Sequence, residues 1–137
     1  MISLILMVVA GALNAVMDRI AFTFKTSVFK DLNPMFWDVS KSWKNQWKQP
    51  MQPSYSDWYY FGLYKPRYQE NYPFSSTFLV WTTDAWHLAK TLMLGLMMCA
   101  VVCYKPMFWG WLDIFILYCG FTVAFTYFYE YILKKTN

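Results

Sequence analysis

The stretch WTTDAWHLAKTLMLGLMMCAVVCY, residues 81–104, sets three polar side chains directly ahead of an apolar run: Asp84, His87 and Lys90. No charged residue interrupts residues 91–104. A helix that crosses a bilayer needs about 20 mostly apolar residues, and this run approaches that length only if the polar turn before it belongs to the same helix. The stretch therefore predicts a membrane-spanning helix whose first turns are polar.

Two further apolar runs, residues 2–24 and 107–133, have the same character. The second helix is expected over residues 76–104, because Pro73 followed by a pair of serines is typical of a helix start. No Lys or Arg precedes the first run, and no small-residue cleavage site follows it, which favours a retained helix over a cleaved signal peptide. We therefore predict an all-α membrane protein with three transmembrane helices in a single membrane domain, residues 1–137.

The composition supports a membrane protein and argues against several other classes. Hydrophobic residues make up 58% and charged residues 15% of the chain, against about 25% charged residues in soluble domains. Aromatic residues reach 23%, with eight tryptophans, and such rings favour the membrane–water boundary as an aromatic belt. The net charge of +4 is too modest to indicate nucleic acid. Three cysteines without a CxxC motif and a single histidine give no metal or cofactor motif, so we predict no metal site and no cofactor.

Residues 25–74 differ from the three runs, because they are rich in proline and polar residues and should lie outside the hydrocarbon. Asn33-Pro34 is a helix start, and the pattern that follows predicts an amphipathic helix at the membrane surface, with rings on one face and lysines on the next. An amphipathic helix packed on another part of the protein is the alternative. The expected membrane-surface residues are Phe36, Trp43, Trp47, Lys41, Lys44 and Lys48. Residues 49–73 read as an irregular aromatic loop.

The distribution of basic residues predicts the orientation in the membrane. Residues 25–74 carry seven Lys or Arg, and two lysines lie near the C-terminus, whereas Lys105 stands alone between the second and third runs. Cytoplasmic loops are enriched in Lys and Arg. We therefore expect an inner-membrane protein with its N-terminus outside, residues 25–74 and the C-terminus in the cytoplasm, and Lys105 outside.

This orientation brings polar residues of all three helices to one depth, near the cytoplasmic edge of the hydrocarbon. The predicted polar cluster consists of Asp18, Arg19, Asp84, His87, Lys90 and Glu130. Charges at this depth are costly unless they are paired or hydrated. Three interpretations stay open: a structural cluster that locks the helices together, a proton or ion site at the histidine, and a metal-assisted or general-base centre. Asp113 is expected to stand alone on the outer side.

Two small-residue motifs indicate close helix packing. Gly11 and Ala15 lie four residues apart in the first run, as do Gly120 and Ala124 in the third. Such faces let helices approach closely in membranes. The motifs could pack within one chain or join copies of it.

Several segments resemble a group of small integral membrane proteins from bacterial and phage genomes. The resemblance rests on NPMFWDVSKSWKNQWKQ (33–49) and SSTFLVWTTDAWHLAK (75–90), followed by a hydrophobic tail, and would cover about residues 10–110. Its landmarks are the N-P-x-F-W, S-W-K-N and T-D-A-W-H segments. The resemblance implies an integral membrane protein and carries no activity with it.

Three functions are compatible with these patterns. The leading hypothesis is a non-enzymatic polytopic membrane protein that acts by assembling with itself or with a membrane partner, since no catalytic motif is recognisable. The first alternative is an oligomeric pore, ion- or proton-conducting or holin-like. The second alternative is a membrane-embedded enzyme that acts on lipid headgroups. The expected partners are the lipid bilayer and a second copy or a membrane protein.

Overall fold

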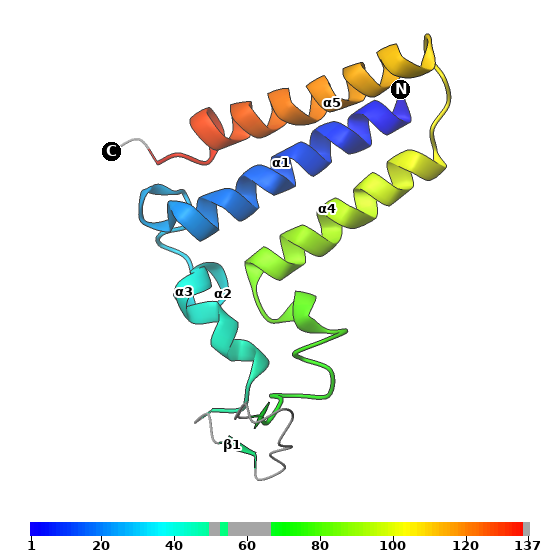
Figure 1. The fold of residues 1–137 in the computed structure, drawn as a ribbon. Coiled ribbons are helices and arrows are strands. Elements are labelled where there is room, and N and C mark those ends of the chain that lie inside the picture. Colours follow the sequence, from blue (N-terminus) through cyan, green and yellow to red (C-terminus); the bar gives the residue numbers. More distant parts are fainter. Residues whose placement is uncertain (50–52, 55–66, 136–137) are drawn as a thin grey trace, which may run out of the picture.

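Three long helices dominate the computed structural model, which describes residues 1–49, 53–54 and 67–135 (Figure 1). They are α1 (Ile2–Phe22), α4 (Ala85–Val102) and α5 (Gly110–Tyr127), and α5 continues as a π-helix over Phe128–Ile132. Each of the three is long and apolar enough to cross a membrane. The prediction of an all-α protein with three candidate membrane helices is confirmed at that level.

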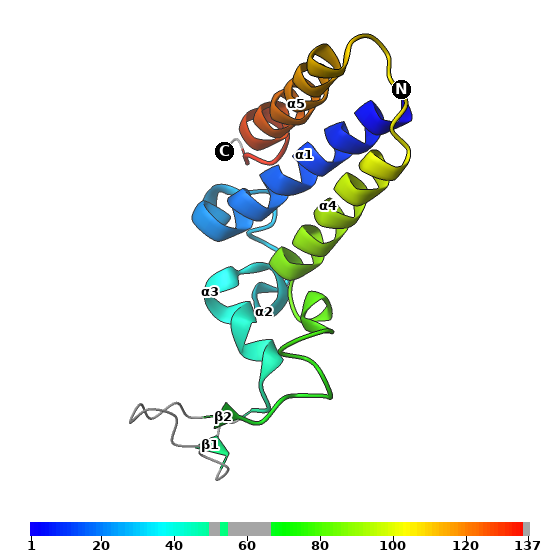
Figure 2. The ribbon, with the colours of Figure 1, turned by 45° about the vertical axis from the view of Figure 1, so that its right-hand side comes forward.

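Helix α1 lies between the other two and packs on both (Figures 1 and 2). It runs parallel to α5 and antiparallel to α4. The N-terminus of α1 lies beside the α4–α5 connection. At the opposite end, the Val28 N–H donates to the Leu133 carbonyl (3.0 Å) and the Lys135 N–H to the Thr26 carbonyl (2.9 Å). The three helices therefore form a layer with α1 in the middle, and not a closed triangle.

Small residues let α1 approach α5 closely. A Cβ atom added to Gly11 would lie 2.2 Å from the carbonyl oxygen of Phe121, and one added to Gly120 would lie 2.7 Å from Cδ1 of Leu4. Ala15 and Ala124 are buried. Helices in lipid associate largely through such van der Waals contact. The structure thus uses both small-residue motifs within one chain.

The second long helix begins later than expected, at Ala85 and not at Ser76. Asp84 has extended backbone angles, and its side chain accepts the His87 N–H (2.8 Å), so it is the N-cap of α4. The residues before it form turns and a 3₁₀ helix, Val80–Thr82. The predicted start is wrong because the serines serve a different purpose: the Ser75 hydroxyl donates to the Gln46 carbonyl (2.7 Å).

The predicted single amphipathic helix after Asn33 is also wrong. Asn33 does cap a helix with Pro34 at its first position, but that helix, α2 (Pro34–Trp37), ends after one turn. The Asp38 carboxylate accepts the Ser40 N–H (3.0 Å) and hydroxyl (2.6 Å) and so starts a new one, α3 (Val39–Ser42), which a 3₁₀ helix (Trp43–Gln46) follows. An aspartate that bonds the local backbone competes with helix continuation. The predicted rings and lysines therefore do not share one helix face.

The segment after these short helices pairs with residues 69–71. The Lys48 N–H donates to the Gln69 carbonyl (2.8 Å), and the Asn71 N–H donates to the Gln46 carbonyl (3.0 Å). Two-residue strands β1 (Pro53–Ser54) and β2 (Arg67–Tyr68) pair antiparallel. Most of the predicted aromatic loop, including residues 55–66, lies outside the described residues.

Candidate functional site

Asp84 and His87 form a close pair at the start of α4. Asp84 is buried, with 2% of its surface exposed, and its carboxylate lies 2.7 Å from Nδ1 of His87. The same carboxylate accepts the His87 N–H (2.8 Å) and the Thr83 hydroxyl (3.2 Å). The Asn45 side-chain amide donates to the Thr83 carbonyl (2.9 Å), which ties this turn to the segment after α3. The carboxylate is thus well supplied with donors and fixes the imidazole through one nitrogen.

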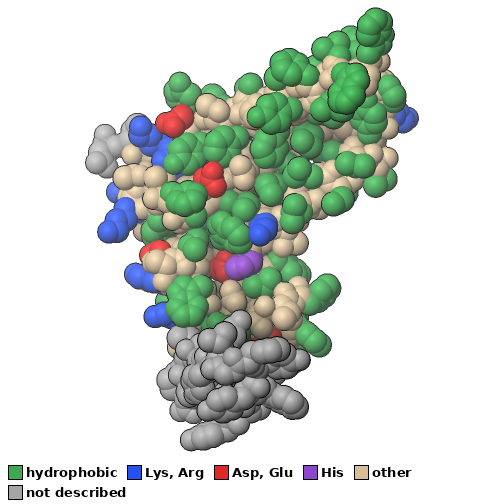
Figure 3. Space-filling view, in the orientation of Figure 1, with side chains coloured by type: hydrophobic (Ala, Val, Ile, Leu, Met, Phe, Trp, Pro, Cys, Tyr) green, Lys and Arg blue, Asp and Glu red, His purple; other side chains and the backbone are tan. Residues whose placement is uncertain are grey.

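The His87 side chain is partly exposed, with 30% of its surface accessible. The Trp86 ring stands edge-on to the imidazole at 5.0 Å, and the Lys90 ammonium lies 4.7 Å from the centroid of the Trp86 indole. Figure 3 shows the histidine on this face, next to a carboxylate. A histidine oriented by a buried carboxylate is suited to accept and release protons.

Arg19 is buried in the last turn of α1, at the end of the layer where α4 begins. Its Nε donates to the Tyr129 carbonyl (2.8 Å), Nη2 donates to the same oxygen, and Nη1 donates to the Thr23 hydroxyl (3.1 Å). The guanidinium also lies over the Tyr129 ring, 3.9 Å from its centroid. Because Tyr129 belongs to the π-helix, where the Leu133 N–H reaches back to the Phe128 carbonyl, its own carbonyl is open to Arg19. Arg19 therefore binds α5 without a carboxylate.

The structure does not join the predicted polar cluster into one pocket. No hydrogen bond or ion pair links Asp18 or Glu130 to Asp84 or His87 in the described ranges. Asp18 is half-buried, whereas Glu130 and Lys90 are exposed. Among the described residues no group of three or more His, Cys, Asp or Glu could hold a metal ion. The physical reason is the position of α1, which separates α4 from α5.

Asp113 forms a polar centre that the sequence reasoning missed, because this residue was expected to stand alone. It is fully buried and accepts the Tyr104 hydroxyl (2.7 Å) and the N–H groups of Met107 (2.9 Å) and Phe108 (3.0 Å). These three bonds fasten the connection between α4 and α5. An aspartate in the first turn of a helix, just after a proline-containing turn, is the signal that could have indicated this role.

The predicted membrane-surface residues divide into two groups. Lys41, Lys44, Lys48 and Trp43 are exposed, whereas Phe36 and Trp47 are half-buried. The Phe36 ring meets Trp37 edge-on at 5.7 Å. The lysines and one ring are thus available for contact.

Two carboxylates outside the long helices have lowered pKa values. Hydrogen bonds from the Ser76 hydroxyl, and then from the N–H groups of Phe74 and Ser76, lower the pKa of Glu70. These bonds close a turn in which Phe74 has a positive φ of 65°. The Lys135 ammonium lowers the pKa of Asp31 and so links the C-terminal segment to the loop after α1.

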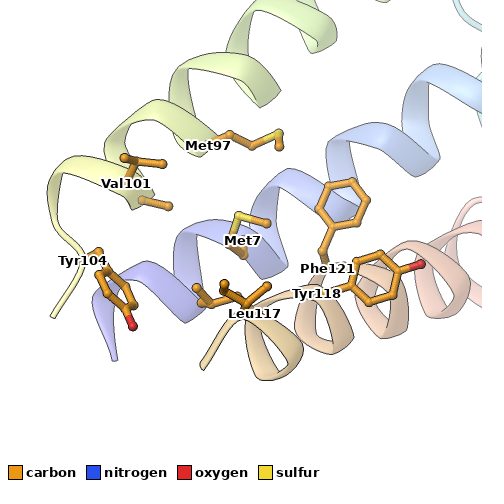
Figure 4. A pocket seen from close by; sticks show the side chains of 9 residues that line it. Met7, Met97, Val101, Tyr104, Leu117, Tyr118 and Phe121 are labelled. Atoms are coloured by element: carbon orange, nitrogen blue, oxygen red, sulfur yellow. The ribbon is translucent and has the colours of Figure 1, made fainter. Parts of the chain in front are cut away.

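Among the hollows on the apolar surface of the helices, two differ sharply in their lining. The α4–α5 groove has a volume of about 610 Å³ and lies between α4 and α5 with α1 as its floor (Figure 4). Its walls include Met7, Met97, Val101, Tyr104, Leu117 and Phe121. The α5 hollow, of about 320 Å³, is lined by Thr122, Val123, Thr126, Tyr127 and Tyr131. The first is almost wholly apolar and the second carries hydroxyl groups.

No protein-family model, no curated protein and no solved structure matches this chain. The resemblance to small bacterial and phage membrane proteins stays a prediction. Function is therefore argued from the side chains and surfaces described above.

Proposed function

We propose that this chain is a non-enzymatic polytopic membrane protein that acts by assembling in the bilayer with itself or with a membrane partner, through the α5 hollow. The observation that carries the proposal is a set of hydroxyl-bearing residues on a face of α5 that no other helix covers: Thr122, Thr126, Tyr127 and Tyr131. The small-residue face of the same helix is already occupied by α1. The hollow is therefore a face of α5 that is open to a partner.

The two threonines of the α5 hollow differ in a way that favours an external partner. The Thr122 hydroxyl donates to the carbonyl of Tyr118 (3.0 Å), one turn back in the same helix. The Thr126 hydroxyl is exposed and forms no hydrogen bond within the part of the chain that the structure describes. A hydroxyl without a partner is costly in hydrocarbon, and threonines often bond across helix interfaces in membranes. A second helix at Thr126 would satisfy this group.

We place the basic end of the layer in the cytoplasm, with the N-terminus outside and the C-terminus inside. Figure 3 shows Lys and Arg side chains gathered over the ends of α1 and α5 and over α2 and α3. The exposed lysines Lys41, Lys44 and Lys48, with Trp43, would rest on the headgroups of the inner leaflet. This arrangement would leave the α5 hollow accessible from within the membrane.

Energy transfer between donor- and acceptor-labelled copies in lipid vesicles tests the proposal. We expect transfer above the level for random mixing, and a clear decrease with Thr126→Val, which removes the unpaired hydroxyl at nearly constant shape. Thr122→Val is the matched control, because that hydroxyl bonds within its own helix. If the wild-type copies show no transfer, capture from solubilised membranes should yield a partner that Thr126→Val loses. The proposal would be contradicted if Thr126→Val changed neither the energy transfer nor the capture of a partner.

A second candidate, an enzyme acting on lipid headgroups, is favoured only by the Asp84–His87 pair. The buried carboxylate orients the imidazole, and the His87 side chain is partly exposed. Phospholipid vesicles incubated with the purified protein would release headgroups if this candidate is right, and His87→Gln would abolish the release while helicity is unchanged. Intact lipid in the wild-type sample would exclude it for the lipids tested.

A further inference from the structure

The α4–α5 groove differs from the α5 hollow in both shape and chemistry. Its lining comes from three helices and from Tyr104, and the hydroxyl groups of Tyr104 and Tyr118 are the polar groups among it. Its volume of about 610 Å³ falls within the size of ordinary small-molecule sites. Figure 4 shows side chains of α1, α4 and α5 around one open space. The groove is therefore large enough for a ligand and offers that ligand mainly apolar contact.

The position of the groove along the helices restricts its occupant. It extends from Met97 to Tyr104 on one side and from Ile114 to Phe121 on the other, which is about 10 Å at 1.5 Å per residue. The hydrocarbon core of a bilayer is about 30 Å thick. One leaflet is about half that thickness. The groove thus matches a chain that occupies a single leaflet.

One end of the groove is held in place by hydrogen bonds. Tyr104, which forms this end, donates its hydroxyl to Asp113 (2.7 Å), and the same carboxylate accepts the Met107 and Phe108 N–H groups. The ring is therefore fixed before any ligand arrives. Lys105, the next residue, is exposed at this mouth. A lysine ammonium is a good partner for a phosphate.

We propose that the α4–α5 groove binds one acyl chain of a phospholipid in the leaflet at the α4–α5 connection, with the phosphate beside Lys105. The apolar walls accept the chain, and the groove is short enough for its occupant to stay within one leaflet. An empty space between helices would forfeit van der Waals contact along its lining. This inference concerns a bound lipid and does not depend on assembly through the α5 hollow.

Native mass spectrometry of the protein, released from detergent after incubation with phosphatidylglycerol, tests the site. We expect one phospholipid to stay bound per chain. Val101→Trp fills the groove and should abolish this retention, whereas Val102→Trp, the matched control, should retain it. Val101 lines the groove and is 73% exposed, while Val102 is 85% exposed and does not line it. Leu117→Trp fills the groove from α5 and replaces the first variant if that one does not fold.

The charge of Lys105 gives a second, separate readout. A basic residue near a membrane surface contributes enough to change affinity about fivefold, so Lys105→Gln should reduce phosphatidylglycerol retention by about that factor. Retention of diacylglycerol with the same chains should not change. Free phosphate should not bind the wild-type protein. The proposal would be overturned if Val101→Trp and Val102→Trp lose lipid equally, or if the wild type retains no lipid. It would also be overturned if the protein forms a dimer that Val101→Trp alone dissociates.

Discussion

Replacing Gly11 with alanine puts a methyl group against the backbone of α5. The new Cβ would lie 2.2 Å from the Phe121 carbonyl oxygen and 3.0 Å from its carbonyl carbon. Because a backbone carbonyl cannot rotate away, α1 and α5 must separate by about 1 Å or more to restore ordinary contact. Overpacking of this kind costs about 1–3 kcal/mol. The better helix propensity of alanine offsets about 1 kcal/mol of that, so we expect net destabilisation of at most about 2 kcal/mol.

Gly95→Ala isolates the packing contribution. Gly95 lies in α4, and no atom would lie within 4 Å of a Cβ added there. Both variants gain the same helix propensity, so the difference between their unfolding free energies should be about 1–3 kcal/mol. Unfolding in mixed micelles of dodecyl maltoside and sodium dodecyl sulfate, followed by circular dichroism, measures it. If Gly11→Ala is as stable as Gly95→Ala, the close α1–α5 approach is refuted.

Four further variants test the polar contacts by the same unfolding assay or by hydrogen exchange. Arg19→Met removes the charged bonds to α5 and should destabilise the protein by about 1.5–3 kcal/mol; an unchanged stability would contradict the contact. Asp113→Ala leaves three donors without an acceptor and should lower the free energy of unfolding by at least about 2 kcal/mol. Tyr104→Phe removes one of these bonds and should lower it by about 1 kcal/mol. Equal losses in the two variants would contradict a carboxylate shared by three donors. Because the pKa of Glu70 is lowered in the folded state, its carboxylate stabilises the fold. This stabilisation is fully present above the usual glutamate pKa and is lost as the pH falls through the folded-state pKa. The protection factors of the Phe74 and Ser76 amide protons, which are corrected for the intrinsic exchange rate at each pH, should therefore fall in acid, and Glu70→Gln should remove this fall.

The three long helices could be predicted from the sequence because length and hydropathy alone decide them. The ends of these helices could not be predicted, because they depend on which side chain caps which backbone group. Ser75 and Ser76 have the composition of a helix start, yet one bonds Gln46 and the other bonds Glu70. Asp84 takes the cap instead. A serine and an aspartate are about equally good caps, so only tertiary contacts could decide between them.

The candidate site was predictable as a pair and not as a cluster. The spacing of three residues lets Asp84, as the N-cap, reach His87 in the first turn of α4, and this local contact does not depend on the tertiary structure. A meeting with Glu130 required a closed three-helix bundle, whereas the helices form a layer. Asp18 lies on the middle helix, but no hydrogen bond or ion pair joins it to Asp84 or His87 in the described ranges. The role of Arg19 could not be predicted for another reason. Its acceptor is a backbone carbonyl in a π-helix, and no pattern of side chains in the sequence indicates such a carbonyl.

The layer arrangement has a consequence for the α4–α5 groove. While α1 separates the two helices, the connection at residues 103–109 joins α4 to α5 directly at the groove, and Asp113 fastens that connection. Asp113 itself does not line the groove. If the connection holds the groove open, Asp113→Ala should weaken phospholipid retention although every groove residue is unchanged, whereas Tyr104→Phe, which keeps the ring and both backbone bonds, should weaken it less. Equal retention in the wild type and Asp113→Ala would show that packing on α1 alone shapes the groove.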